Sequence, residues 1–403
     1  MDIELKNVVY NYKAELNIEL NEILNYWVNN TVDNEYGGFV GAIDENNNVI
    51  PNAPKSAILY SRILWAFSSA YSITTQPKHL QFATIAFKYL QANFIDKKQG
   101  GIFWMLNANA TVLETKKQVY ALAFAIYGLS AYYNVTNNIL AKQMAIALFE
   151  CIEIHSFDVN HTGYLEAFSV DWQPIIDVRL SSKDVNEKKT MNTHLHVLEA
   201  YTLLYKIWPN QLLKTRINQL LKNFTQFFID KNTFHLHLFF TDDWQLKSNT
   251  VSFGHDIEAA WLLVKAAEVM NDAALLHNIQ SIAQKITTAA LKGIDVDNGM
   301  WYEYEKSTGI TCKQKHWWVQ AEAMVGFFNG WQISGQHQYL QQSMDTWGYV
   351  KGAIKDNQYG EWYWGRNDNG TVMKNQDKVG VWKCPYHNTR ACIEIINRIN
   401  ALN

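Results

Sequence analysis

Two kinds of helical pattern alternate along the chain. Residues 79–95, HLQFATIAFKYLQANFI, place apolar side chains on one side of a helix and polar ones on the other, which predicts an amphipathic surface helix. Residues 118–133, QVYALAFAIYGLSAYY, are apolar nearly all round, as expected of a fully buried helix. Between such helices lie short stretches in which aromatic residues alternate around a glycine, a pattern that indicates β-strands.

These patterns recur as a repeat. Five glycine-aromatic stretches are centred on the glycines at 38, 101, 163, 299 and 360, and NTFHLHLFFTDDW at 232–244 fills the gap between the third and the fourth. The chain therefore divides into six units of about 60 to 70 residues, a period typical of repeat architectures. The six buried helices are expected to begin near Ser56, Gln118, Asn192, His255, Trp317 and Tyr386.

Six pairs of outer amphipathic and inner apolar helices predict an all-α fold. Helices must bury an apolar stripe against other helices, and six pairs close naturally into a double-walled ring, an (α/α)6 barrel with short β-hairpins at one mouth. We expect residues 1–403 to form this single domain. An open solenoid is the alternative, but it needs polar capping repeats, and the chain shows none.

The barrel predicts where a functional site lies. All six inner helices run in the same direction, so their N-terminal ends meet at one mouth, and convergent polar groups in a concave place indicate a site. The residues near these starts are Arg62, Tyr120, Asn192, His196, His255, Glu258, Trp318, Glu322, His387 and Arg390, with Trp382 just before the last helix.

Helical spacing groups some of these residues on common faces. Asn192, His196 and Glu199 are four and three residues apart and share a face, although Asn192 alone can be read as an ordinary N-cap. His255 and Glu258 are also three apart, which predicts an imidazole–carboxylate pair that fixes the tautomer.

Metal binding is less favoured by the sequence. No H-E-x-x-H or Cys/His ligand spacing is present, so we expect no metal, and a zinc site on the three mouth histidines is the minor alternative. The remaining histidines His235, His237 and His316 are expected to be ordinary surface or strand residues.

Composition narrows the classes of partner. A net charge of −3 favours neither nucleic acid nor an anionic membrane, and the 15 Trp, 21 Tyr and 19 Phe fit either a large core or a pocket that stacks sugar rings. Four cysteines without a C-x-x-C pair are typical of reduced thiols in the cytoplasm. We see neither a signal peptide nor an apolar run of bilayer length.

The mouth chemistry favours proton transfer over glycoside hydrolysis. Sugar-cleaving enzymes rely on two carboxylates flanking the bond, whereas Glu258 and Glu322 here accompany histidine or tryptophan on their own helices. Histidine exchanges protons near neutral pH, which suits abstraction of a proton next to a carbonyl. A reducing sugar supplies that carbonyl when its ring opens, and its acidic proton is on C2.

At these residues the chain resembles the cellobiose 2-epimerases of the N-acylglucosamine 2-epimerase superfamily. The resemblance rests on NTHLHVLEAY (192–201), GHDIEAAWLL (254–263), WWVQAEAMVGF (317–327), GEWYWG (360–365) and WKCPYHNTRACIEI (382–395), and it extends from about Tyr36 to the C-terminus. It implies an (α/α)6 barrel that needs no cofactor and that interconverts glucose and mannose at the reducing end of β-1,4-linked disaccharides.

The resemblance also implies roles for residues. The catalytic histidines of the family fall on His196, His255 and His387, and its sugar-binding positions fall on Arg62, Asn192, Trp318, Trp382, Glu258 and Glu322. We expect His387 and His255 to flank C2 while His196 assists ring opening. His387 is expected in the first turn of the last helix, where the helix dipole favours a neutral imidazole.

The sequence does not decide whether the substrate is a disaccharide or a free monosaccharide. A sister group acts on free glucose and mannose, and an aldose–ketose isomerase is a more distant alternative. The loop at 180–192, with Asp184, is where a second sugar is expected to bind. We further expect a cytoplasmic enzyme, monomeric or weakly associated, without metal or nucleotide.

Overall fold

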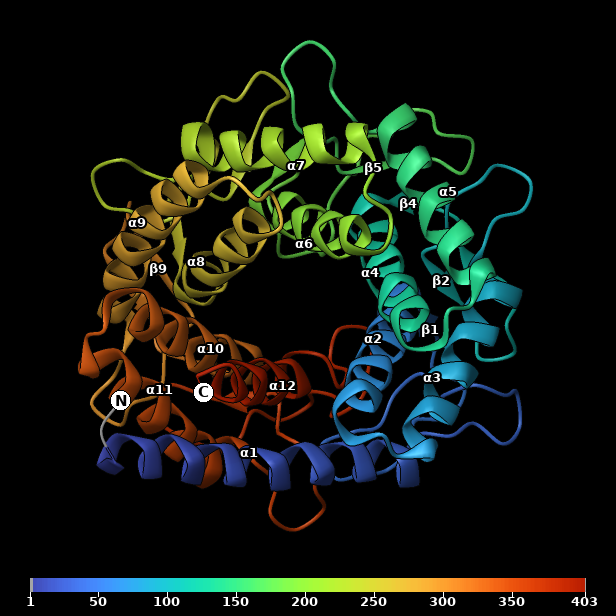
Figure 1. Ribbon diagram of the computed structural model, residues 1–403. Coiled ribbons are helices and arrows are strands. Elements are labelled where there is room, and N and C mark those ends of the chain that lie inside the picture. Colours follow the sequence, from blue (N-terminus) through green and yellow to red (C-terminus); the bar gives the residue numbers. More distant parts are fainter. Residues whose placement is uncertain (1–2, 403) are drawn as a thin grey trace.

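The computed structural model describes residues 3–402, whose helices form two concentric rings (Figure 1). The inner ring consists of α2 (Ala57–Thr74), α4 (Val119–Thr136), α6 (Met191–Ile207), α8 (Phe253–Glu268), α10 (Trp317–Ser334) and α12 (His387–Asn400). The outer ring consists of α1 (Ile3–Asn30), α3 (Pro77–Tyr89), α5 (Ile139–His155), α7 (Gln211–Asn223), α9 (Ala273–Ala290) and α11 (His337–Tyr349). Each inner helix packs on the next and α12 returns to α2, so the ring closes and the predicted (α/α)6 barrel is confirmed.

Burial explains which helices lie inside. In α4 every side chain from Val119 to Tyr132 is buried, whereas the outer helix α7 buries only one stripe. The inner helices begin within two residues of the predicted starts. No helix within residues 3–402 has both the length and the apolar character that crossing a bilayer requires.

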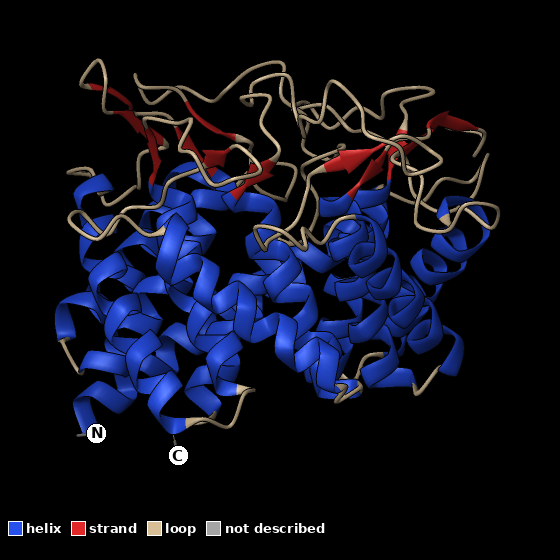
Figure 2. Cartoon of the chain, turned by 90° about the horizontal axis from the view of Figure 1, so that it is seen from above, coloured by secondary structure: helices blue, strands red, loops and turns tan. Residues whose placement is uncertain are grey.

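Short strands gather at one end of the barrel, as Figure 2 shows. They are β1 (Lys55–Ser56), β2 (Met105–Leu106), β3 (Val112–Glu114), β4 (Lys117–Gln118), β5 (Ala167–Phe168), β6 (Lys189–Thr190), β7 (Phe239–Phe240), β8 (Thr250–Ser252), β9 (Glu303–Glu305), β10 (Ile310–Cys312), β11 (Lys315–His316) and β12 (Gly365–Arg366).

The strand pairing ties neighbouring repeats together. The strand before an inner helix pairs with the hairpin of the following repeat, in antiparallel pairs such as β1–β2, β4–β5 and β6–β7. A bridge between Ile43 and Val379 joins the last repeat to the first. The mouth is therefore closed by backbone hydrogen bonds as well as by helix packing.

A buried ion pair recurs in these loops. The carboxylate of Asp96 accepts the backbone N–H groups of Lys98 and Gln99 and binds Lys117 Nζ at 2.6 Å. Equivalent pairs join Lys55 to Asp33, Lys189 to Asp158, Lys315 to Asp295 and Lys378 to Asp356. Four of these lysines lie in the strand just before an inner helix, and Lys378 lies in the loop that leads to α12, so each pair fixes the segment before an inner helix against the loop of its own repeat.

The fourth residue of an inner helix also holds a hairpin. Tyr60, His194, Asp256 and Gln320 accept the backbone N–H groups of Phe39, Tyr164, Leu236 and Met300, respectively. The ring of His194 lies against Gly163, where a Cβ would approach its Nε2 atom to 2.7 Å at a φ of +80°. His194 thus faces outward to the hairpin while His196 faces the barrel axis, as their spacing predicts.

The hydrogen bonds of His194 require a neutral imidazole. Its Nδ1 lies 2.7 Å from the Thr190 carbonyl, and its Nε2 accepts the Tyr164 N–H at 2.9 Å. Burial lowers the pKa of His194 to about 3, far below the value of about 6.5 expected in an unfolded chain. Between these two values the unfolded state binds the extra proton, so the stability that the neutral ring contributes is lost as the pH falls.

We therefore expect His194→Gln to flatten the pH dependence of stability. Between about pH 6 and about pH 4, the free energy of unfolding of the wild type should fall more steeply than that of the variant. The difference between the two slopes should be about 1.4 kcal/mol per pH unit, the contribution of one titrating group. Urea unfolding at several pH values measures both slopes. His161→Gln, at a half-exposed surface histidine, is the matched control, and parallel slopes for wild type and His194→Gln would contradict the assignment.

Candidate active site

A cavity of about 430 Å³ opens at the mouth formed by the inner-helix N-termini. Of the residues predicted for the site, Arg62, Tyr120, Asp184, Asn192, His196, His255, Glu258, Trp318, Trp382 and His387 line it. Glu322 lies behind this wall, where its carboxylate contacts His387 and Arg390. The structure thus brings together residues from all six inner helices and from the loops between them.

His387 is the first residue of α12 and has a carboxylate behind it. Its Nδ1 lies 2.7 Å from Glu322 Oε1, so the ring donates from Nδ1 and leaves the Nε2 lone pair available. Burial, together with the nearby cations Arg62 and Arg390, holds the pKa of His387 well below its usual value. The predicted neutral imidazole is supported, with burial as the largest cause.

His196 carries a similar partner. Its Nδ1 lies 2.9 Å from Glu199 Oε2, as the shared helical face predicts. Burial lowers the pKa of His196 although Glu199 opposes the shift. Burial also disfavours the Glu199 anion, yet Arg390 and His196 beside it hold the pKa of Glu199 below its usual value.

His255 differs from the other two histidines. Its Nδ1 lies 2.9 Å from Ser252 Oγ, and its ring packs against Trp318 with the centroids 4.8 Å apart. Burial lowers its pKa to about 3, helped by His196 nearby. The predicted pairing with Glu258 is wrong, because the Glu258 carboxylate turns to a buried cation, Arg390.

Arg390 organises the floor of the cavity. Its guanidinium is fully buried and binds Glu199, Glu258 and Glu322, with Glu322 at 2.7 Å. Burial and the neighbouring Glu322 raise the pKa of Glu258 to about 8. Arg390, which donates to Glu258 Oε1, opposes this shift, while Glu322 accepts hydrogen bonds from Arg390, His387 and Trp261.

Three of these groups lie close enough together to be considered as metal ligands. Ligand atoms of Glu258, Glu322 and His387 lie within 4.8 Å of one another. The Arg390 guanidinium already bonds to both carboxylates, so a side-chain cation occupies the position that a metal ion would need. The donor set does not fit a resident metal, and the absence of a metal requirement stays a prediction.

Two polar side chains are available for a ligand. Arg62 donates to the Trp382 carbonyl at 3.1 Å and to the Tyr120 hydroxyl at 2.8 Å, which fixes its guanidinium in the wall. Asn192 is not the N-cap of α6, because Thr190 takes that place. The buried Asn192 Oδ1 accepts no hydrogen bond from any residue within 3–402, so a ligand hydroxyl can satisfy it.

The outer part of the cavity contains residues that sequence reasoning missed. His316, expected to be an ordinary strand residue, is buried in β11 and stacks on Tyr302 with the ring centroids 4.0 Å apart. Trp364 and Gln376 line the same part. Asp184 also lines the cavity, from the loop at 180–184, where its carboxylate accepts the Ser181 N–H at 2.8 Å. Burial raises the pKa of Asp184.

Comparison with known proteins agrees with this geometry. The family model for N-acylglucosamine 2-epimerase matches residues 37–391. A cellobiose 2-epimerase of Bacteroides fragilis is 46% identical over 95% of this chain and 98% of its own length, and one of Dictyoglomus turgidum is 34% identical over 94% and 96%.

Solved structures give the same result. Cellobiose 2-epimerase from Bacillus thermoamylovorans superposes with a TM-score of 0.92 at 37% identity, covering 96% of this chain and 100% of that one. A D-mannose isomerase with a TM-score of 0.84 and 23% identity shares the fold. The helical barrel, the histidines at its mouth and these matches lead to one conclusion: the chain belongs to the N-acylglucosamine 2-epimerase family.

Proposed function

We propose that this protein is a cellobiose 2-epimerase, which interconverts glucose and mannose at the reducing end of a β-1,4-linked disaccharide. The observation that carries the proposal is the pair of neutral imidazoles, His387 and His255, that both pack against Trp318 in one cavity. A buried imidazole with its Nδ1 atom occupied by a partner presents Nε2 to a substrate, as a proton acceptor does.

The reaction then runs through an enediolate. One imidazole takes the C2 proton of the ring-opened sugar, and the electron pair of that C–H bond moves toward the carbonyl at C1. The negative charge of the enediolate raises the pKa of the other imidazole, which takes a proton from solvent and delivers it to the opposite face of C2. The first imidazole then releases its proton to solvent, so both rings return to the neutral form. His196 assists ring opening, and Arg62 with Asn192 holds the sugar oxygens while Trp318 and Trp382 exclude water.

Glycoside hydrolysis is not favoured by this cavity. A hydrolase needs two carboxyl groups that face the scissile bond. The buried carboxyl groups here are bound to Arg390, and Glu322 acts through His387 as a positioning residue.

The outer part of the cavity supports a disaccharide substrate. Tyr302, His316 and Trp364 form an aromatic wall in the cavity that Asp184 also lines, and aromatic faces with nearby polar groups suit a second sugar ring. The relatives described above as cellobiose 2-epimerases agree with this choice. Epimerisation of free glucose and mannose is the alternative. We also propose a cytoplasmic enzyme, a monomer or weak oligomer, in agreement with its four free cysteines.

Replacement of His387 tests the chemistry directly. We expect His387→Asn to keep the fold and bind cellobiose while its turnover falls by about 10²- to 10⁴-fold, because general acid–base catalysis contributes that much. In D₂O the wild type should place deuterium at C2 of the glucosyl-mannose product, measured by NMR after chromatography. His161→Asn is the surface control and should retain full turnover.

Two results would contradict this assignment. One is near-normal turnover of His387→Asn. The other is a wild-type product without deuterium at C2 after many turnovers, long enough for a shielded base to exchange its proton. Fructose-type products in place of epimers would instead indicate an isomerase.

Replacement of Asp184 tests the length of the substrate. If Asp184 binds the second sugar, Asp184→Asn should lower kcat/KM for cellobiose by about tenfold, the effect of one lost hydrogen bond to a charged group, and leave kcat/KM for free glucose unchanged. Asp177→Asn, at an exposed position shortly before the loop that carries Asp184, is the control. Faster turnover of glucose than of cellobiose by the wild type would favour the monosaccharide epimerase.

A further inference from the structure

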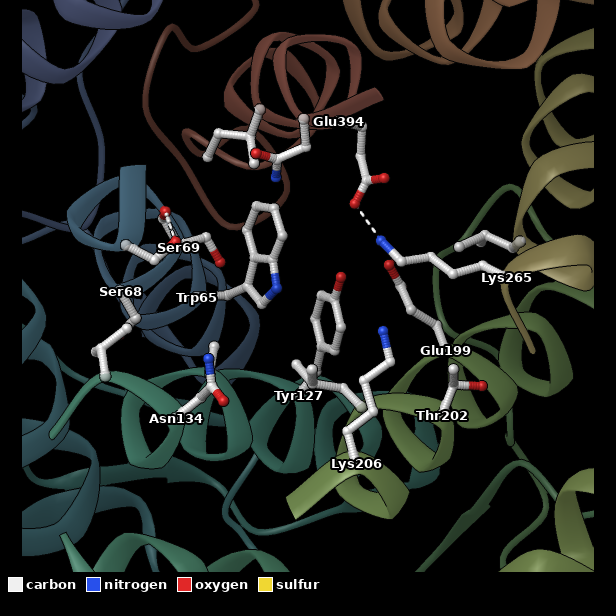
Figure 3. Close-up of a pocket in the computed structure, with 17 residues that line it drawn as sticks. Trp65, Ser68, Ser69, Tyr127, Asn134, Glu199, Thr202, Lys206, Lys265 and Glu394 are labelled. Carbon is white, nitrogen blue, oxygen red and sulfur yellow. Dashed lines mark hydrogen bonds and ion pairs between the residues drawn. The ribbon is translucent and has the colours of Figure 1, made fainter. Parts of the chain in front are cut away.

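A second cavity lies on the barrel axis at the end opposite the sugar site. It measures about 140 Å³ and is lined by the C-terminal halves of α2, α4, α6, α8 and α12. Figure 3 shows side chains from these helices pointing into a common space, among them Trp65, Tyr127 and Lys206. Nothing in the proposed epimerisation uses this cavity.

The cavity changes character with depth. Its inner end is formed by the buried side chains of Trp65, Tyr127 and Glu199. Above them follows a mainly apolar belt, interrupted by the hydroxyl groups of Ser68, Ser69 and Thr202, whose apolar residues are Ala131, Val135, Leu203, Leu262 and Ile393. The rim is polar, with Ser72, Asn134, Lys206, Lys265 and Asn397. An apolar belt below a polar rim suits a short ligand with a carbon chain and a polar head group.

The rim charges favour an anionic head group. Lys265 is bound to Glu394, whereas the Lys206 ammonium has no ion-pair partner within residues 3–402. Partial burial lowers the pKa of Lys206, and the neighbouring Lys265 lowers it further. Of the two ammonium groups of the lining, Lys265 is neutralised by Glu394, whereas Glu394 and Glu268 act on Lys206 only through longer-range electrostatics. Lys206 is therefore the ammonium group that can bind an anion directly.

We propose that this rear cavity binds a short-chain aliphatic carboxylate. The carboxylate group lies at the rim against Lys206 and Lys265, and the chain lies in the apolar belt above Trp65 and Tyr127. The small volume restricts the ligand to a few heavy atoms and excludes a sugar ring with its hydroxyls.

The position of Glu199 links this cavity to the sugar site. Glu199 lines the inner end of the rear cavity, and the same carboxylate binds His196 and Arg390 beneath the sugar site. A ligand that packs against Glu199 alters the packing and field around these groups. Occupancy of the rear cavity therefore changes turnover without any contact to the sugar.

Calorimetric titration with sodium butyrate tests the binding. We expect saturable binding to the wild type with a Kd of about 1 mM or below, within the range that a ligand of this size can reach. Lys206→Met should weaken it about tenfold because the rim loses its free cation. Ala131→Leu, which fills the apolar belt, should abolish it. Lys222→Met, at an exposed lysine of the outer helix α7, is the matched control and should bind as the wild type does.

The neutral and inorganic probes decide the ligand class. Butyramide has the same carbon chain as butyrate but no negative charge, and inorganic phosphate has negative charge but no carbon chain. Both are titrated at the same ionic strength as butyrate. Both should bind at least about tenfold more weakly than butyrate. Equal binding of phosphate, or binding of butyrate that Lys206→Met and Ala131→Leu leave unchanged, would overturn the proposal.

The coupling between the rear cavity and the sugar site through Glu199 is tested separately, by the rate of turnover. At saturating butyrate we expect kcat for cellobiose to change by about twofold or more in the wild type and to stay constant in Ala131→Leu. An unchanged kcat in a wild type shown to be saturated would overturn the coupling. Since binding is measured without sugar, failure of the epimerase assignment would leave the binding result intact.

Discussion

The ion cluster around Arg390 is the interaction on which the rest of the site depends. One fully buried guanidinium from α12 binds Glu199 of α6, Glu258 of α8 and Glu322 of α10. Removing one partner from a buried ion pair costs about 3–5 kcal/mol, so these carboxylates hold four inner helices in one arrangement. The cluster also determines which groups face the sugar and which stay behind the wall.

As a result, the carboxylates and the imidazoles of the site have different roles. Because the carboxylates are bound to Arg390, they orient histidines rather than act on a glycosidic bond. Glu322 and Glu199 accept the Nδ1 protons of His387 and His196, and burial keeps these rings neutral. A fold shared with enzymes that cleave sugars thereby presents proton-transfer groups at the mouth of its barrel.

Sequence periodicity predicted the barrel, the inner-helix starts and the His196–Glu199 pair, because all of these depend on short-range spacing. It could not predict that Glu258 turns away from His255, since the competing cation, Arg390, is 132 residues further along the chain. The position of His316 in the cavity could not be predicted, because an alternating strand pattern does not show which face of the strand borders a cavity. The buried Lys–Asp pairs join separate parts of each repeat and are equally invisible to helical spacing.

Catalysis by His387 requires a neutral imidazole whose Nδ1 proton points to Glu322. The most direct test is ¹⁵N NMR of the histidine side chains, with His387 assigned by comparison with His387→Asn. We predict that the His387 ring carries its proton on Nδ1, titrates well below pH 6.5, and loses this tautomer preference in Glu322→Leu, which has no acceptor for the Nδ1 proton. A ring that titrates above about pH 6.5, or that carries its proton on Nε2 in the wild type, would contradict the account.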